Sequence, residues 1–374
     1  MGGQYQPKTF IVLCLFLAGC GIPRGAGVQS EVLAVDKKTA EGGIPAEFDV
    51  VAVTRSSLDV INKWPGAGAK QYSWINREPH VPNTIIAPGD VLTVKVWDTE
   101  SNSLLARSGD RVSEITDLNV SPQGTVALPF LGELKVSGMT PEAARATIEE
   151  NYIASIPSAQ VQIVVTPGRA NTANLVSGVA QPGVYPLPDR DFTLLGLLSQ
   201  GGGVQQNLSN PQVRLMRGSG IYGVSIKQLF ENPALDTTLR GGDRVIVEED
   251  SRYFLSLGAA GSEALHAFPK ETVSALDAIS IIGGVQDSRA NPQGILILRE
   301  YPKEALRPNG QGPLHERVVF TLDLTTADGL FSAGTFPVIS GDLVYATESR
   351  LTSVSTVFGI IGSVLGIANT ASGL

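Results

Sequence analysis

The sequence is poor in the residue types that build metal, redox and nucleophilic centres. It contains two cysteines, Cys14 and Cys20, and three widely separated histidines, His80, His266 and His315. Zinc sites need cysteine and histidine ligands at short spacings, so we expect no metal site and place the histidines on surfaces or loops. Beyond Cys20 no disulfide can form. The stability of the chain must therefore come from packing and assembly.

Positive charge is also scarce. The net charge is −8, charged residues make up 17% of the chain, and no basic patch is found. Binding nucleic acid through its phosphates requires such patches, so we expect no nucleic-acid partner. The glycines at 201–203 follow a predicted helix, whereas a nucleotide-binding loop follows a strand and opens a helix. We therefore expect no cofactor.

Catalytic groups are not evident either, since no nucleophile stands beside a base. The acidic clusters at 189–191 and 248–250 could in principle supply the carboxylate pair of a glycoside-cleaving enzyme. Both are flanked by strand ends and turns, so we expect them on the solvated surface. The residues thus predict a protein that is not an enzyme and has no catalytic residues. An enzyme acting on polysaccharide through Asp189 or Asp191 stays open as an alternative.

Glycine and proline, in contrast, are abundant, with 41 and 23 residues. Together with short runs of valine, isoleucine and leucine, they indicate turn-rich β structure. A chain of 374 residues is long enough for several domains. The predicted fold class is a β-rich α+β protein.

The N-terminus has the order of a secretion signal. Lys8 precedes an apolar run over residues 10–17, and small residues follow. The sequence Leu17-Ala18-Gly19-Cys20 resembles the cleavage box of bacterial lipoproteins, so Cys20 is the expected site of lipid attachment. Gly21, rather than aspartate, is typical of lipoproteins sent to the outer membrane. Since one lipid anchor binds a membrane only moderately, a second membrane contact would be useful.

The C-terminus offers that second contact, because no charged residue follows Arg350. As a helix, residues 351–368 would span roughly 27 Å, close to the hydrocarbon thickness of a bilayer. One arc is apolar and expected to face lipid: Leu351, Val354, Val357, Phe358, Ile361, Val364 and Leu365. The opposite arc is expected to face a pore or a neighbouring helix: Thr352, Ser355, Thr356, Gly359, Gly362, Ser363 and Gly366. A helix docked on the protein's own core is the alternative.

Several elements are predicted between the two termini. Residues 21–38 predict a tether, residues 48–54 a strand, and residues 58–80 irregular backbone anchored by aromatic side chains. Residues 91–97 alternate as a strand, and after a polar loop further strands are expected around 120–129. A helix is predicted from Thr140, as its cap, to about Tyr152, followed by a strand around 161–165.

The chain repeats itself beyond Gly168. Val176 aligns with Leu257 and Asn210 aligns with Asn291, both pairs 81 residues apart. Each copy predicts two strands, a short helix stopped by glycines at 194–200 or 275–282, and a last strand opened by Gly-Asp. The second copy is longer by an insertion around residues 302–316.

These segments together resemble the outer-membrane polysaccharide export proteins of the Wza type. Residues 86–90 and 120–125 resemble the polysaccharide-export domain, and the segments from Val176 and Leu257 resemble two SLBB β-grasp repeats. The resemblance implies a homo-oligomeric ring, an octamer, whose C-terminal helices form a barrel through the outer membrane above periplasmic domains. It also implies an inner-membrane polysaccharide copolymerase as partner, often a tyrosine kinase, a polysaccharide substrate, contact with outer-membrane lipid, and an N-terminal strand at 48–54 added to a later domain.

The expected organisation follows from this resemblance: a signal peptide (1–19), a lipid-anchored tether with N-terminal strands (20–84), the export domain (85–168), two repeats (169–250 and 251–349) and a membrane helix (350–374). The expected function is a translocon that exports capsular polysaccharide or exopolysaccharide. A periplasmic glycan-binding lipoprotein that does not span the membrane is the alternative.

Overall fold

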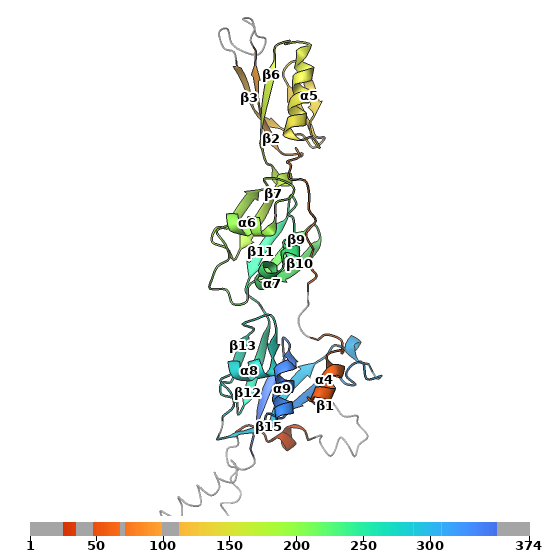
Figure 1. Ribbon diagram of the computed structural model, residues 1–374, viewed down its shortest axis with the longest axis vertical. Helices are drawn as coiled ribbons and strands as arrows, with labels where there is room; N and C mark the ends of the chain where they lie inside the picture. The colour runs from red at the N-terminus through yellow and green to blue at the C-terminus, as the bar shows by residue number, and fades with distance from the viewer. Residues whose placement is uncertain are drawn as a thin grey trace, which may run out of the picture. The chain divides into compact units, whose positions relative to one another are not determined.

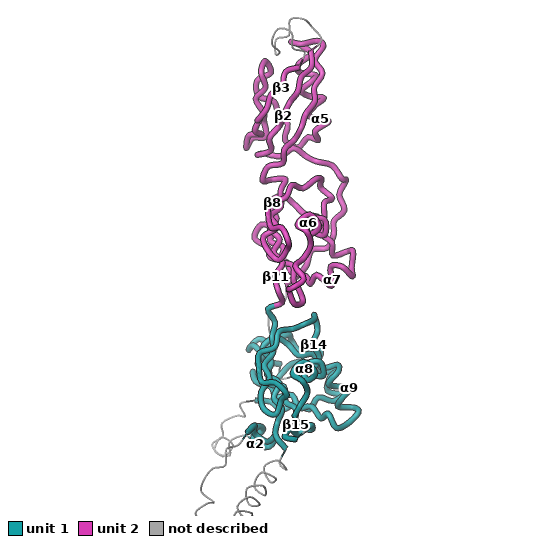
Figure 2. Tube along the Cα trace, turned by 90° about the vertical axis from the view of Figure 1, so that its left-hand side faces the viewer, with its two compact units in different colours: residues 1–69, 251–374 teal, residues 70–250 magenta. Residues whose placement is uncertain are grey.

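The computed structural model describes residues 25–34, 48–67, 72–98, 112–286, 288–307 and 309–349. The chain forms two compact units (Figure 2). One unit is built from residues 70–250, and the other combines residues 1–69 with residues 251–374. The N-terminal part of the chain therefore belongs to the same unit as its C-terminal part.

The unit of residues 70–250 begins with a three-stranded antiparallel sheet and one helix (Figure 1). β2 (Val91–Trp97) is central, between β3 (Val112–Asn119) and β6 (Gln160–Thr166), and α5 (Pro141–Ile153) packs on β6. β4 (Thr125–Leu128) and β5 (Gly132–Lys135) form a separate hairpin. The predicted alternation along β2 is confirmed, because Leu92, Val94 and Val96 are buried together with Ile148 and Tyr152 of α5.

The same unit contains the first copy of the repeat as a five-stranded sheet of order β10-β9-β11-β7-β8. Its core lies between this sheet and two short helices, with Leu194 and Leu197 of the first helix fully buried. The elements are β7 (Thr172–Ser177), β8 (Gly183–Pro186), α6 (Leu194–Gln200), β9 (Gln212–Arg217), β10 (Gly220–Ser225), α7 (Ile226–Glu231) and β11 (Arg244–Glu248), with 3-10 turns η2 (Arg169–Asn171) and η3 (Pro233–Leu235).

The second copy lies in the other unit and repeats this strand order as β16-β15-β18-β12-β13. The predicted internal repeat is thus confirmed in three dimensions, and the predicted insertion lies between β15 and β16. The elements are β12 (Tyr253–Gly258), β13 (Ala264–Ala267), β14 (Val273–Ser274), α8 (Ala275–Ile281), β15 (Ala290–Glu300), η4 (Lys303–Ala305), β16 (Arg317–Leu322), α9 (Ala327–Thr335), β17 (Pro337–Val338) and β18 (Leu343–Glu348).

The second sheet carries an additional strand from the N-terminal part of the chain. β1 (Asp49–Ala52) pairs in parallel with β16, with Val51 opposite Phe320. The predicted added strand at 48–54 is confirmed. It covers a sheet edge that would otherwise offer unpaired backbone groups to another chain. The Asp49 carboxylate strengthens this contact by accepting a hydrogen bond of 2.8 Å from the Leu314 N–H.

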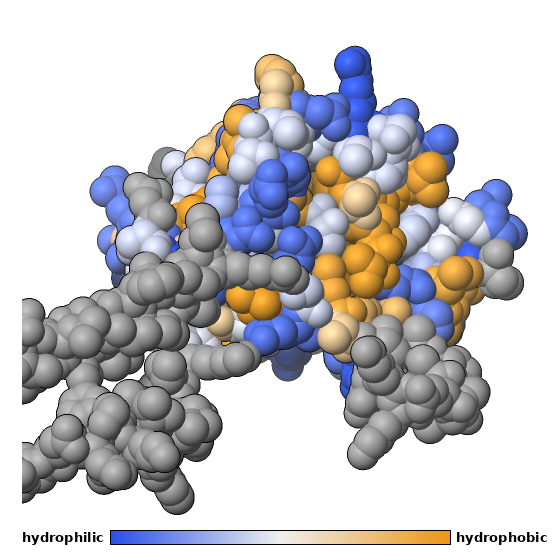
Figure 3. Space-filling view, turned by 90° about the horizontal axis from the view of Figure 1, so that it is seen from below, coloured by the Kyte–Doolittle hydropathy of each residue, from blue (hydrophilic) through white to orange (hydrophobic). Residues whose placement is uncertain are grey.

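The aromatic anchors predicted in residues 58–80 are also confirmed. In the unit that contains β1, the Trp64 ring lies against Tyr301 and Phe320, with centroid distances of 5.9 and 6.1 Å. In the unit of residues 70–250, the Trp74 indole donates a 2.7 Å hydrogen bond to the Leu235 carbonyl. Figure 3 shows the hydropathy of one face of the molecule, where apolar side chains gather in a band bordered by polar ones.

Three local expectations are wrong. The polar loop expected before residue 120 contains β3, an edge strand whose side chains are mostly exposed, so the sequence lacks the apolar alternation of a core strand. The irregular backbone expected from residue 58 begins with α4 (Arg55–Ile61), which is held by burial of Leu58 and Ile61. The tether includes α2 (Gln29–Val32), next to Gly27, whose N–H donates to the Tyr345 hydroxyl at 2.8 Å.

Each of the three hydrophobic cores has one strand opened by a Gly-Asp pair. The glycine has a positive φ of +85° to +94°, which only glycine adopts without strain. The aspartate is at most 2% exposed, and its carboxylate accepts a hydrogen bond from the backbone N–H three residues earlier. The pairs and their donors are Gly89-Asp90 with Ala87, Gly242-Asp243 with Arg240, and Gly341-Asp342 with Ile339.

The predicted lipid site at Cys20 and the predicted membrane helix from 350 to 374 lie outside the described residues. Among the residues that the structure does describe, no helix has both the length and the apolar character required to cross a bilayer.

Candidate ligand-binding cleft

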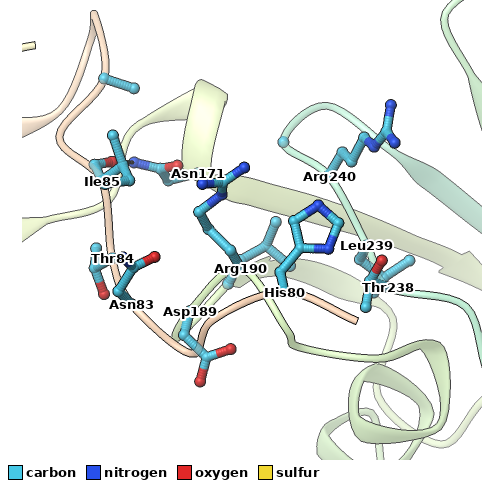
Figure 4. Close-up of a pocket in the computed structure, with 13 residues that line it drawn as sticks. His80, Asn83, Thr84, Ile85, Asn171, Asp189, Arg190, Thr238, Leu239 and Arg240 are labelled. Carbon is cyan, nitrogen blue, oxygen red and sulfur yellow. Dashed lines mark hydrogen bonds between the residues drawn. The ribbon is translucent and has the colours of Figure 1, made fainter. Parts of the chain in front are cut away.

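The main candidate site is a cleft of about 420 Å³ within the unit of residues 70–250 (Figure 4). Four loops line it: the segment that leads into β2, the turn η2, the loop between β8 and α6, and the loop before β11. Its lining is mostly polar, and it includes His80, Asn83, Asn171, Arg190 and Arg240. The volume lies within the roughly 300–1,000 Å³ of small-molecule sites.

Asp90 holds one wall of the cleft in place. Its carboxylate accepts hydrogen bonds from the Gly168 N–H at 2.7 Å and from the Asn171 side-chain amide at 2.8 Å. The same amide donates to the Ile85 carbonyl at 3.0 Å. The Gly168 backbone lies so close to Gly89 that a side chain does not fit, since a Cβ there would lie 2.0 Å from the Gly89 carbonyl oxygen. The buried carboxylate thus joins the segment before β2 to the turn before β7.

Asp243 holds the opposite wall. The Arg217 guanidinium donates to both carboxylate oxygens, with Nε–Oδ1 at 3.0 Å and Nη2–Oδ2 at 2.6 Å. Nη2 also donates to the Thr238 carbonyl at 2.8 Å, and the Arg240 N–H donates to Asp243 at 2.9 Å. The loop of residues 238–241 is therefore fixed by an ion pair whose carboxylate is buried.

His80 is positioned by its backbone. Its N–H donates to Asp191 at 3.0 Å, and the Arg77 guanidinium pairs with the same carboxylate at 2.8 Å. The His80 hydrogen bond and then the Arg77 side chain hold the pKa of Asp191 below its usual value. The His80 Nδ1 lies 2.7 Å from the Glu78 carbonyl, which can only accept, so Nδ1 carries the proton and Nε2 of the neutral ring is left as an acceptor.

Two polar groups of the cleft have no partner among the residues that the structure describes. The Asn83 Oδ1 atom is buried without a hydrogen bond, although buried polar atoms are normally satisfied. The Arg190 guanidinium forms no ion pair or side-chain hydrogen bond with any residue that the structure describes, whereas Arg240 is paired with Glu78 at 3.0 Å. In Figure 4 the Arg190 side chain extends between Asn171 and His80, and the Asp189 carboxylate points away from them. The cleft therefore offers an available cation and an available acceptor.

The structure gives the predicted acidic clusters different environments. Asp191 is engaged by Arg77 and His80, and Asp189 accepts a 2.8 Å hydrogen bond from the Asp191 N–H. The expectation of solvated surface is wrong for Asp250, which is 7% exposed and accepts a hydrogen bond of 2.7 Å from Asn210. Within the described ranges, no three histidine, cysteine or acidic side chains cluster as a metal site would require.

The expectation of surface or loop positions holds for His80 and His315, which lie in loops, and fails for His266. His266 lies on β13, where its ring stacks on Phe254 at a centroid distance of 5.1 Å and contacts the Ser256 hydroxyl at 2.7 Å. His315 lies in a loop, and its Nδ1 contacts the Asp49 carboxylate at 2.6 Å. The expectation is therefore wrong for His266, which packs within a sheet.

Sequence reasoning did not bring the cleft residues together. Asn83, Asn171 and Arg190 lie in three separate loops and belong to no motif of fixed spacing. The one available signal was the recurrence of Gly-Asp before a strand, because two of these pairs hold the cleft walls. The predicted lipid-facing and pore-facing residues between 351 and 366, like Cys20, cannot be placed, since they lie outside the described residues.

Comparison with known proteins identifies similar chains over nearly the whole length. The family model described as polysaccharide biosynthesis/export protein matches residues 78–166. The capsule polysaccharide export outer membrane protein CtrA of Neisseria meningitidis is 29% identical, over 99% of this chain and 98% of its own. The capsule polysaccharide export protein BexD of Haemophilus influenzae is 25% identical over 96% of each chain, and the Vi polysaccharide export protein VexA/TviF of Salmonella typhi is 25% identical over 96% and 98%.

Proposed function

Because this chain belongs to the polysaccharide biosynthesis/export protein family, we propose that it is the outer-membrane protein through which a capsular polysaccharide or an exopolysaccharide leaves the cell. The observation that carries this proposal is the length of the similarity. Relatives named as capsule export proteins match the N-terminal segment, the export domain and both repeats, and not the export domain alone. The chain acts as a passage and not as an enzyme.

The structural form of this passage is part of the proposal. We infer a ring of identical subunits, with Cys20 carrying the lipid and the helix of residues 350–374 acting as one element of a barrel through the outer membrane. The resemblance to the Wza type and the two-faced sequence of that helix support this form. A polysaccharide copolymerase in the inner membrane, often a tyrosine kinase, would deliver the substrate to the ring.

The domain division is proposed on the same basis. A tether and N-terminal strands (20–84) lead to an export domain (85–168), followed by two β-grasp repeats (169–250 and 251–349). The three separate hydrophobic cores and the repeated strand order support this division. The N-terminal strand β1, bound to the second repeat, supports a chain that passes back along its own later domains.

A deletion strain tests the proposed function. We expect loss of surface polysaccharide and its accumulation inside the cell, with recovery when the full chain is supplied. Surface and internal polysaccharide are measured with a polysaccharide-specific stain or antibody before and after cell lysis. A chain ending at Arg350 should not restore export although its periplasmic part is folded. Normal surface polysaccharide in the deletion strain would contradict the function, and export by the truncated chain would contradict the membrane helix.

A further inference from the structure

The cleft of the unit 70–250 has an uncompensated positive charge. Of its two arginines, Arg240 is neutralised by Glu78 at 3.0 Å, while Arg190 has no ionic partner among the described residues. The acidic residue that lines the cleft, Asp189, points away from the Arg190 side chain in Figure 4 and is hydrogen-bonded to the Asp191 N–H. A guanidinium presents a planar fork that matches a carboxylate or a phosphate group.

The same cleft has uncharged groups suited to hydroxyl groups. The buried Asn83 Oδ1 lacks a donor in the described part of the chain, and the His80 Nε2 is left as an acceptor by the bond of Nδ1 to Glu78. Leaving a buried acceptor unsatisfied is unfavourable, so a ligand hydroxyl that donates a hydrogen bond to Asn83 would favour binding. Acceptors beside a single cation are the complement of a polyol that carries one negative charge.

Two walls of the cleft are held in place by buried carboxylates. Asn171 is held by Asp90 and by the Ile85 carbonyl, and the loop of residues 238–241 is held by Asp243. Both carboxylates are buried, at 0% and 2% exposure. The cleft therefore does not have to be ordered by its ligand, which lowers the entropic cost of binding.

We propose that this cleft binds an acidic sugar unit, with Arg190 contacting the negative group and with Asn83 and His80 accepting hydrogen bonds from sugar hydroxyls. This inference rests on the proposed function and specifies the class of polysaccharide: one whose repeating unit carries a carboxylate or a phosphate. The cleft acts as a weak contact site for the passing chain, because one exposed arginine gives modest affinity and permits release.

Binding to the purified full chain in detergent micelles tests this proposal. The probes are trigalacturonate for the carboxylate, glucose 6-phosphate for the phosphate and maltotriose for a neutral sugar, each titrated by ligand-observed NMR. We expect one acidic probe to bind at least about tenfold more tightly than maltotriose, with an affinity that falls as salt is added. Which acidic probe binds more tightly distinguishes the two anion sources.

Variants tie the binding to the cleft. Arg190→Gln should weaken the acidic probe about tenfold or more and leave maltotriose unchanged, whereas Arg190→Lys should retain part of the affinity. Asn83→Asp, which adds a negative charge, should weaken the acidic probe as well. The matched control is Arg55→Gln, since Arg55 is also exposed but belongs to the other unit. The affinity of this variant for the acidic probe should change less than twofold. Circular dichroism checks that each variant is folded.

The proposal is overturned if maltotriose binds as tightly as both acidic probes, if Arg190→Gln binds them as the unchanged protein does, or if no probe binds at millimolar concentration. These failures can be distinguished from failure of the proposed function. If the proposed function is wrong, the deletion strain exports polysaccharide normally, whatever the purified protein binds. If the deletion strain loses export and only the binding test fails, the proposed function is supported and the proposed acidic-sugar site is refuted.

Discussion

Arg299 and Asp342 form a buried two-point ion pair in the second repeat, with Nε–Oδ1 at 2.9 Å and Nη2–Oδ2 at 2.8 Å. The side chains are 5% and 1% exposed, and Arg299 also donates to the Pro337 carbonyl at 2.7 Å. Arg217 and Asp243 form the same pair in the first repeat. The Gly-Asp turn therefore has the same role in both copies: its buried carboxylate fixes the start of the last strand.

Removing one member of this pair should destabilise the second repeat strongly. Asp342→Ala leaves Arg299 buried without its counter-charge, which typically costs about 3–5 kcal/mol. The measurement is urea unfolding followed by circular dichroism. Replacing both residues, Arg299→Met with Asp342→Leu, should recover much of the loss because no unpaired charge remains. The matched control is Glu300→Gln, from the exposed pair with Arg317, which should cost at most about 1 kcal/mol.

Gly168 should tolerate no side chain. Gly168→Ala places a Cβ 2.0 Å from the Gly89 carbonyl oxygen and 2.9 Å from the Asp90 N–H nitrogen, so one backbone segment must move. We expect a loss of about 2 kcal/mol in unfolding free energy. Faster hydrogen exchange at Ala87 and Asn171, measured by mass spectrometry, should accompany it. Gly183→Ala in β8 meets only Tyr185 at 3.6 Å and should change both quantities little; equal effects at the two positions would contradict the close-contact argument.

Asp277 should make the folding stability of the second repeat depend on pH. The Lys270 ammonium first and then the Ser274 N–H hold the pKa of Asp277 below its usual value. A lowered pKa in the folded state adds stability above the unfolded pKa of about 4, and this stability is lost as the pH falls through the folded value. Asp277→Asn should therefore lower the Tm by a few degrees at pH 7. The Tm difference from the unchanged protein should shrink below about pH 4.

A series of thermal melts from pH 7 to pH 3 measures this difference. Asp328→Asn is the matched control, because Asp328 is also in the first turn of a short helix but has no hydrogen bond or ion pair among the described residues. Its Tm should change less than that of Asp277→Asn at pH 7. A Tm difference for Asp277→Asn that stays constant down to pH 3 would contradict the role of its ionised form.

The two faces of the predicted membrane helix can be tested with a single added charge. Ile361→Arg puts the charge on the arc expected to face lipid and should cost about 2–3 kcal/mol near the membrane centre. Thr356→Arg puts it on the arc expected to face the pore or a neighbouring helix and should be milder. Protein recovered in the outer-membrane fraction and polysaccharide at the cell surface are the measurements. Equal loss at both positions would refute the assignment of faces.

Local patterns were sufficient for much of the fold. The alternation of residues 91–97, the capping signal at Thr140 and the spacing of 81 residues between the two copies each predicted an element that the structure contains. Elements without a strong apolar pattern were missed. β3 is an exposed edge strand, and α4 has only seven residues, so neither leaves a periodic signal long enough to read.

The cleft could not be predicted in the same way. The recognised acidic cluster at 189–191 contained Arg190, but its neighbours in sequence do not reveal that the guanidinium lacks a partner. That fact depends on Glu78 pairing with Arg240 and on Arg77 pairing with Asp191, contacts between residues far apart in the chain. Pairing of charges is decided by position in space, and sequence spacing constrains it only within a helix or a strand.

The sequence by itself determined the repeat and the family resemblance, and it predicts the secretion signal and the lipid site, because each depends on residues close together or on a regular spacing. Only the tertiary structure decided which long-range contacts form. Asn171 reaches Asp90 across 81 residues, and Asp49 reaches the Leu314 N–H across 265. The physical reason is that burial makes an unpaired carboxylate costly, so each buried aspartate must find a donor, and the folded chain alone determines which donor is within reach.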